Sequence, residues 1–130
     1  MAFHGHVANL AEIADLLGCQ ANDPALVYGA AIDAWGNDAD RKLIGEYCAV
    51  VFDPVGNRVR LSRSPLRAPP LHYFAGEGRI AAASVPRAIF ALDIPRKLND
   101  RRIADSAWVN FSDETASWYE GLSRVPLGAI

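Results

Sequence analysis

Two thiols, Cys19 and Cys48, are the strongest nucleophiles that this sequence offers. A thiol attacks a carbonyl carbon as the thiolate, so a reactive cysteine needs a neighbouring base or cation that lowers its pKa. Cys19 directly follows Gly18, where a helix is expected to end, and Cys48 lies inside an apolar run of strand length. A thiol in such surroundings stays protonated. Both cysteines are therefore predicted to be structural, and no catalytic residue is assigned.

Two histidines near the start of the chain are the next candidates for chemistry. His4 and His6 are two positions apart and would share one face of a strand. A metal site usually needs three or four ligands, and here His72 is remote in the sequence and no carboxylate has a matching spacing. We expect no metal and no other cofactor.

Helices are predicted on both sides of Asp23. Asn9 followed by Glu12 is typical of a capping box, and the apolar spacing after it predicts an amphipathic helix that ends at Gly18. Asp23 can cap a second helix, because Pro24 fits the first helical position, and that helix is expected to run to Gly36. Further short helices are predicted over residues 85–91 and from Asn99 or Asp100 through Ala107.

Strands are predicted mainly in the middle of the chain. The continuous apolar run 47–52 indicates a strand buried on both faces. Turn residues at 53–57 lead into the alternating segment 58–62, whose Arg58 and Arg60 are expected to lie on a solvated face. The proline-rich segment 64–70 is predicted to be irregular, and strands are predicted at 71–74 and 79–83 around a glycine turn. The pattern favours one α+β domain over residues 1–130, with a largely antiparallel sheet covered by helices.

Composition excludes several classes of partner. The chain has 130 residues, of which 51% are hydrophobic, and a formal net charge of -2. There is no basic block for nucleic acid or an anionic membrane, and no apolar run long enough to span a bilayer. Two cysteines without a disulfide framework, together with an opening segment that has no signal-peptide pattern, predict a cytoplasmic protein.

The sequence contains six segments, at residues 3–9, 22–36, 45–53, 61–73, 82–84 and 118–128, that resemble, in order, segments of one known family. This family is the class II glutamine amidotransferase (glutaminase) domain of asparagine synthetases. The first, FHGHVAN, is similar to that family's Phe-Asn-Gly-Glu-Ile-Tyr-Asn, and the third, GEYCAVVFD, resembles its Gly-Met-Phe-Ala-Phe-Ala-Leu-Trp-Asp strand. The colinear order extends over nearly the whole chain.

The resemblance implies an N-terminal nucleophile hydrolase fold, in which two antiparallel sheets are layered with helices. The family's nucleophile is a cysteine at the very start of the mature chain, where its own α-amine serves as the base. Here Met1, Ala2 and Phe3 open the sequence. The resemblance therefore implies a domain that is truncated and incomplete at its N-terminal side, without the family's first strands and nucleophile.

The resemblance also implies three substrate-binding positions, His4, Gly5 and Asp23. The family's Asn-Gly pair forms an oxyanion hole, and His4-Gly5 occupies that place with histidine for asparagine. Asp23 matches the aspartate that anchors the amino group of glutamine, although a helix N-cap explains it equally well. Ser64, Arg67 and Val85 replace the family's aspartate, glycine and glutamate. These changes indicate a degenerate site.

The resulting expectation is a noncatalytic glutamine amidotransferase-like domain of an amide-forming ligase. Such a domain would act as a scaffold, or bind a glutamine-like or peptide ligand, and would pack against a synthetase domain. One alternative is a fragment of an active glutamine-hydrolysing asparagine synthetase, and another is a small interaction domain without a ligand site. Because missing strands would expose unpaired edges, a homodimer is also expected.

Overall fold

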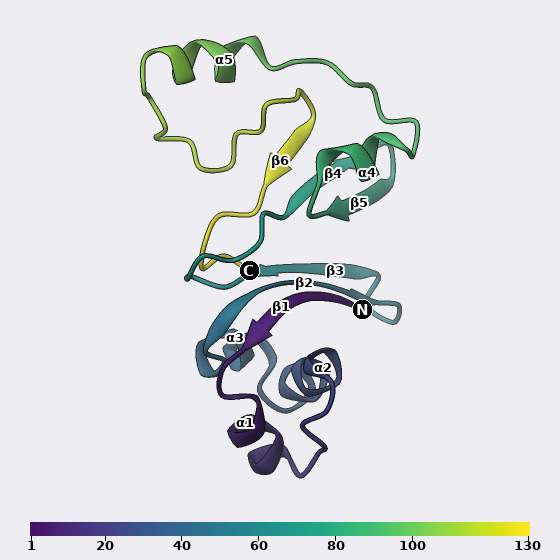
Figure 1. Cartoon of the computed structure of the whole chain (residues 1–130). Helices are drawn as coiled ribbons and strands as arrows, with labels where there is room; N and C mark the ends of the chain where they lie inside the picture. Colours follow the sequence, from purple (N-terminus) through teal and green to yellow (C-terminus); the bar gives the residue numbers. More distant parts are fainter. The chain divides into compact units, whose positions relative to one another are not determined.

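The computed structural model describes residues 1–130, and its backbone contacts divide the chain into two compact units (Figure 1). Unit 1 comprises Met1–Pro69 and Leu127–Ile130, and unit 2 comprises Pro70–Pro126. Each unit holds one three-stranded sheet, in which every strand pair is antiparallel.

Unit 1 is a sheet with a layer of helices on one face (Figure 1). The strand order is β1-β2-β3, and the pairing sets Gly5 opposite Tyr47 and Ala49 opposite Ser62. The elements of unit 1 are β1 (Ala2–Val7), α1 (Leu10–Leu17), α2 (Pro24–Trp35), η1 (Gly36–Asp38), α3 (Ala39–Lys42), β2 (Gly45–Asp53) and β3 (Arg58–Arg63).

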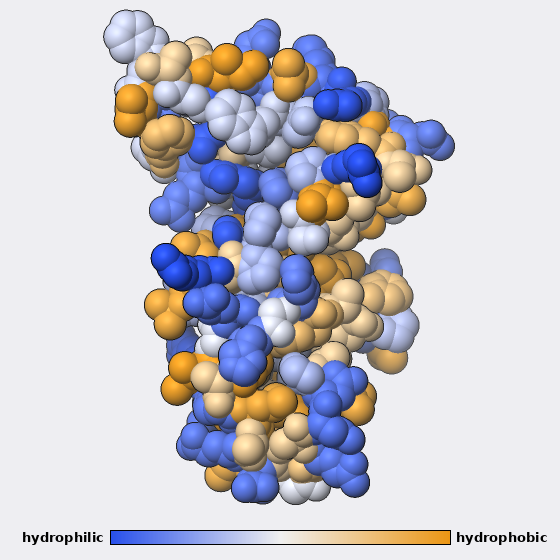
Figure 2. All heavy atoms as spheres, viewed as in Figure 1, coloured by the Kyte–Doolittle hydropathy of each residue, from blue (hydrophilic) through white to orange (hydrophobic).

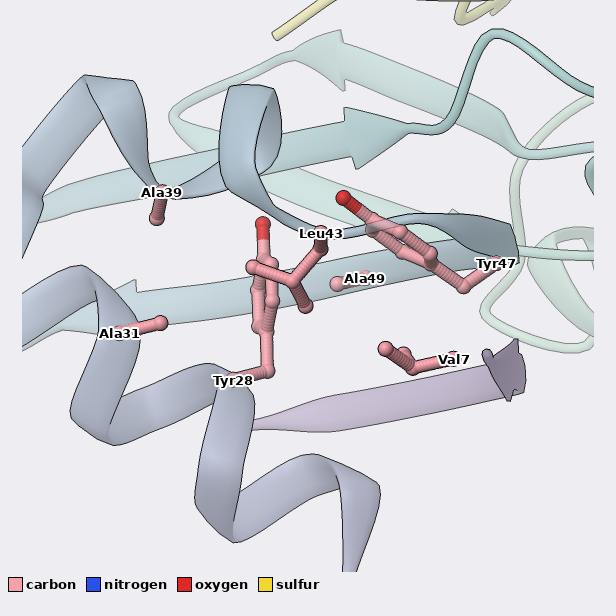
Figure 3. Packing of buried hydrophobic residues seen from close by; sticks show 7 residues of the cluster. All are labelled: Val7, Tyr28, Ala31, Ala39, Leu43, Tyr47 and Ala49. Atoms are coloured by element: carbon pink, nitrogen blue, oxygen red, sulfur yellow. The ribbon is translucent and has the colours of Figure 1, made fainter. Parts of the chain in front are cut away.

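The core of unit 1 lies between the helices and this sheet, where two tyrosines form its centre (Figure 3). Tyr28 of α2 and Tyr47 of β2 are fully buried, and their ring centroids are 5.7 Å apart. Phe3 of β1 stacks on Tyr47 with centroids 5.3 Å apart. Side chains alternate between the faces of a strand, so Tyr47 and Ala49 face the helices while Cys48 faces the other side.

Both long helices of unit 1 begin where the sequence predicts, but one cap works differently. The Asp23 side chain accepts a hydrogen bond from the Ala25 amide at 2.8 Å, as expected of an N-cap. Asn9 precedes α1 but makes no capping bond. Instead its amide side chain donates to Lys42 O and accepts from Ile44 N, so the predicted capping box was wrong. Asn9 therefore joins α1 to the segment that leads into β2.

Unit 2 is a smaller sheet with two short helices. Its strand order is β5-β4-β6, and its core is Ala81, Ile89, Ile94 and Leu122. The predicted strands and helices are confirmed to within about two residues at their ends, whereas β6 was not predicted. The elements of unit 2 are β4 (His72–Gly76), β5 (Arg79–Ala83), α4 (Pro86–Phe90), α5 (Asp100–Ala107) and β6 (Leu122–Arg124).

Two predictions about exposure fail in unit 1. Arg60 was expected on a solvated face, but its side chain is 15% exposed and pairs with Asp40. The strand over 47–52 was expected to be buried on both faces, yet burial fades along it, and Phe52 is exposed. The alternation of β3 was thus a correct sign of a strand, but Arg60 and Ser62 on its polar face contact Asp40 of α3 rather than water.

The coarse fold class is confirmed as a mixed α and β structure with antiparallel sheets and helices. A single domain over residues 1–130 stays a prediction. None of the helices combines the length and the apolar character needed to cross a membrane. On the face that Figure 2 shows, apolar side chains are scattered among polar ones.

Candidate substrate-binding site

Gly5 lies at a close approach of β1 and β2. Its φ is +130°, and a Cβ built on it would meet Glu46 O and lie 2.6 Å from the Cα of Tyr47. A side chain at this position would therefore collide with the backbone of the neighbouring strand. The requirement for glycine is structural in this sheet, independently of any role in binding an oxyanion.

His4 and Asp23 belong to different layers of unit 1. His4 is exposed, and it alternates with the helix-facing residues Phe3 and Gly5, so it lies on the sheet face away from the helices. Asp23 is the N-cap of α2, which covers the other face, and its carboxylate accepts a hydrogen bond from this helix. No hydrogen bond joins the two residues. Glutamine binding by His4, Gly5 and Asp23 stays a prediction.

Cys48 is placed in a row of potentially reactive side chains that the sequence did not reveal. The register sets it opposite His4 on one side and Arg63 on the other. Burial raises the pKa of the Cys48 thiol, and the positive charge of Arg63 opposes this only in part. The Cys48 thiol makes no hydrogen bond. The thiol is thus held in its protonated form, which is a poor nucleophile.

Cys19 also has a structural environment. It follows Gly18, whose left-handed backbone ends α1, and its amide donates to Ala14 O at 3.0 Å. Its side chain is partly buried against the small cluster of Ile13, Ala14 and Val27. Both cysteines are free thiols.

The loop after β3 uses its polar residues to hold backbone. The guanidinium of Arg63 donates to Ala68 O and Pro69 O, both at 3.0 Å. Ser64, at the position of the family's aspartate, is buried, and its hydroxyl accepts from the Tyr47 amide at 3.0 Å. Arg67 takes a left-handed backbone with φ +34°, the conformation that glycine would adopt most easily. The turn therefore keeps the backbone conformation that a glycine would adopt, and its polar side chains hold neighbouring backbone groups by hydrogen bonds.

The most highly connected polar group in unit 1 is Asp40 of α3, which sequence reasoning missed. Its carboxylate accepts from Tyr28 Oη at 3.0 Å and from Tyr47 Oη at 2.9 Å. It also accepts from Ser62 Oγ and from the guanidinium of Arg60, which donates further to Asn37. The sequence signal that could have pointed to Asp40 was the pair of tyrosines in apolar segments, because the hydroxyl of a buried tyrosine needs a hydrogen-bond partner.

Asp40 also affects the ionisation of its tyrosine partners. Burial is the largest cause that raises the pKa of Tyr47, and the negative charge of Asp40 adds to the rise. Burial likewise raises the pKa of Tyr28. The phenols remain protonated donors to the carboxylate. The cluster is therefore a structural link between the helices and β2–β3, and not a source of a phenolate nucleophile.

Comparison with known families agrees with the arrangement described above. A family model described as a glutamine amidotransferase domain matches residues 1–130. The chain belongs to this family of glutamine amidotransferase domains. No curated protein matches the chain.

Proposed function

We propose that this chain is a glutamine amidotransferase-type domain that does not hydrolyse glutamine and serves an asparagine synthetase-like, amide-forming ligase as a scaffold or binding domain. The proposal includes the N-terminal nucleophile hydrolase fold and a reducing, cytoplasmic setting, in which both cysteines stay free.

The state of Cys48 carries this proposal. Glutaminase chemistry requires a thiolate beside a base and beside donors that face the developing oxyanion. Cys48 is inside a strand, where burial raises its pKa, and an internal residue has no α-amine to act as its base. His4 is opposite it in register, but no hydrogen bond joins the imidazole to the sulfur. Neither Cys48 nor Cys19 has the environment of an activated nucleophile.

The direct test is an assay for glutamate and ammonia with the purified 130-residue chain and excess glutamine. We expect no release above the buffer blank, and no change on Cys48→Ala. Glutamate release that Cys48→Ala abolishes would overturn the proposal. If a version extended at its N-terminus by a segment with a terminal cysteine releases glutamate while the 130-residue chain does not, the alternative of an active synthetase fragment is favoured instead.

Residual binding of a glutamine-like ligand can be separated from the capping role of Asp23. We expect Asp23→Ser to preserve the helix cap, because serine is a good N-cap, but to remove the carboxylate that would hold an ammonium group. Asp23→Ala removes both. Glutamine binding is measured by calorimetry, and its loss in both variants supports a role of Asp23 in holding the ligand. Binding that persists in Asp23→Ser assigns Asp23 to the fold alone.

The free edge of β1 supports the proposal of a partner. β1 pairs with β2 on one side and with no strand on the other, so its outer backbone groups are open to another chain. We expect a homodimer through this edge, or packing against a synthetase domain. Small-angle scattering at high concentration tests the first possibility, and a strictly monomeric mass contradicts it.

A further inference from the structure

Arg102 of α5 is a buried cation without a carboxylate partner. The residue is 5% exposed, and none of the ion pairs in the structure includes it. Its one side-chain hydrogen bond runs from Nη1 to Asp113 O at 3.5 Å, the limit of such a contact. Its Nε is buried and has no acceptor. Because burying an uncompensated charge is costly, this arrangement calls for an anion.

The position of Arg102 is fixed from several sides. Its amide donates to the side chain of Asn99, the N-cap of α5, and Asn99 also donates to Ser117 O at 3.2 Å. The guanidinium carbon lies 5.2 Å from the ring centroid of Phe111 and 5.8 Å from that of Trp118. The aromatic rings and the cap hold the side chain in place, and the edge formed by Nε and Nη2 makes no hydrogen bond. Nε is enclosed, so Nη2 is the free donor that an anion can reach, and a guanidinium donor binds a carboxylate oxygen strongly.

A polar cavity of about 240 Å³ lies beside this arginine, entirely within unit 2. Ser117 and Ser123 also line it, and each carries a hydroxyl that can donate. The volume suits a small molecule of a few heavy atoms rather than a macromolecular segment. The cavity therefore combines a fixed guanidinium with additional groups that can donate hydrogen bonds.

The two carboxylates that line the cavity are already engaged. Asp113 accepts from Thr115 N at 2.9 Å and Thr115 Oγ1 at 2.6 Å, and these bonds lower the pKa of its carboxyl group. Asp105 lies 3.9 Å from Arg101 Nε and accepts from Asn110 Nδ2 at 3.4 Å. Neither carboxylate therefore neutralises Arg102. Their negative charge does disfavour a dianion such as phosphate, while a monoanion meets less repulsion.

We propose that this cavity binds a small carboxylate, which accepts a hydrogen bond from Nη2 of Arg102. The cavity is separate from the positions His4, Gly5 and Asp23, all of which belong to unit 1. The ligand is a monocarboxylate that fits the cavity, with its planar group bonded to the guanidinium and its remainder near the serine hydroxyls. The assignment does not depend on whether the domain hydrolyses glutamine.

The test is a titration of the full ¹⁵N-labelled chain with sodium acetate at constant ionic strength, followed by NMR. The Arg102 Nε–Hε signal is identified by its loss in Arg102→Lys. We expect this signal and the amides of Ser117 and Ser123 to shift saturably, with a dissociation constant in the millimolar range for so small a probe. Shifts that sodium chloride reproduces, or that never saturate, overturn the proposal.

Two variants make the test specific. Arg102→Lys keeps the charge but loses the planar guanidinium and its fixed Nη2 donor, so acetate affinity measured at Ser117 and Ser123 should fall about tenfold or more. Arg87→Lys is the matched control, because Arg87 of α4 is exposed and does not line the cavity, and it should leave affinity unchanged. Equal losses in both variants contradict the proposal. If Arg102→Lys does not fold, the wild-type titration decides by itself.

A phosphate titration distinguishes the class of anion. We expect inorganic phosphate to bind more weakly than acetate, because Asp105 and Asp113 repel a dianion. Tighter binding of phosphate would overturn the assignment to a carboxylate.

Discussion

The two units each bury an arginine, and they treat it in opposite ways. Both side chains leave Nε without a partner, but Arg60 of unit 1 pairs with Asp40 and Asn37, whereas Arg102 of unit 2 has no carboxylate. A cation whose counterion is supplied by the fold stabilises that fold. A cation that the fold positions but does not neutralise is available to a ligand. The same residue type thus indicates a structural link in one unit and a binding site in the other.

Removing the counterion of Arg60 is the strongest way to test this contrast. Asp40→Ala leaves the cation of Arg60 without its carboxylate and three hydroxyls, of Tyr28, Tyr47 and Ser62, without their acceptor. We expect a loss of about 3–5 kcal/mol in the free energy of unfolding, measured with urea. Asp40→Asn, which keeps a neutral acceptor, should lose less. A loss below about 1 kcal/mol in Asp40→Ala contradicts the structural role.

Removing each arginine in turn compares the two units directly. Arg60→Met leaves Asp40 as a nearly buried anion, with a side chain 11% exposed, and should cost about 2–4 kcal/mol in urea unfolding. Arg102→Met removes an uncompensated charge at the expense of two cation–π contacts, so the change should stay within about 1 kcal/mol of zero. Equal large losses in both variants would show that Arg102 is structural too.

High pH should weaken unit 1 through its tyrosines. Burial raises the pKa of Tyr28 and Tyr47 in the folded state, so these phenols stay protonated when those of the unfolded chain ionise above about pH 10. Their stabilising effect is complete below that pH and is lost as pH rises. Each contributes a slope of at most about 1.4 kcal/mol per pH unit. Urea unfolding at pH 9 to 11 measures it, and Tyr47→Phe should reduce the slope; an unchanged slope contradicts this assignment.

The sequence predicted local elements better than the polar contacts between them. Asp23-Pro24 and Gly18 mark helix ends through local backbone chemistry, and the structure confirms both. By contrast, η1, α3 and β6 are too short to show a periodicity, and Asp40 has its partners on three other elements. Arg60 shows the same limit, because alternation identifies a polar face but not whether a helix layer or water covers it.

The sequence predicted the local properties of the candidate-site residues better than it predicted how these residues are arranged in space. The spacing of His4 and His6 correctly indicated a strand, whereas the steric requirement for glycine at Gly5 was not predicted, and both cysteines were expected to be structural. The row of His4, Cys48 and Arg63 depends on the register of three strands, which the pattern of single residues did not specify. Arg102 gave no signal, because a charged residue in a short polar helix is usually solvated.

Substitutions at the two helix N-caps are expected to have the smallest effects, and they also compare the two units. Asp23 is exposed and accepts one hydrogen bond from its own helix, whereas Asn99 caps α5 and also donates to Ser117 O. Asp23→Ala should therefore cost about 0.5–1 kcal/mol in urea unfolding and Asn99→Ala about 1–2 kcal/mol. Asn99→Ala should also loosen Arg102 and weaken acetate binding, while Asp23→Ala should leave it intact. If Asn99→Ala changes stability alone, the cap does not position the guanidinium, and the aromatic contacts of Phe111 and Trp118 must hold it instead.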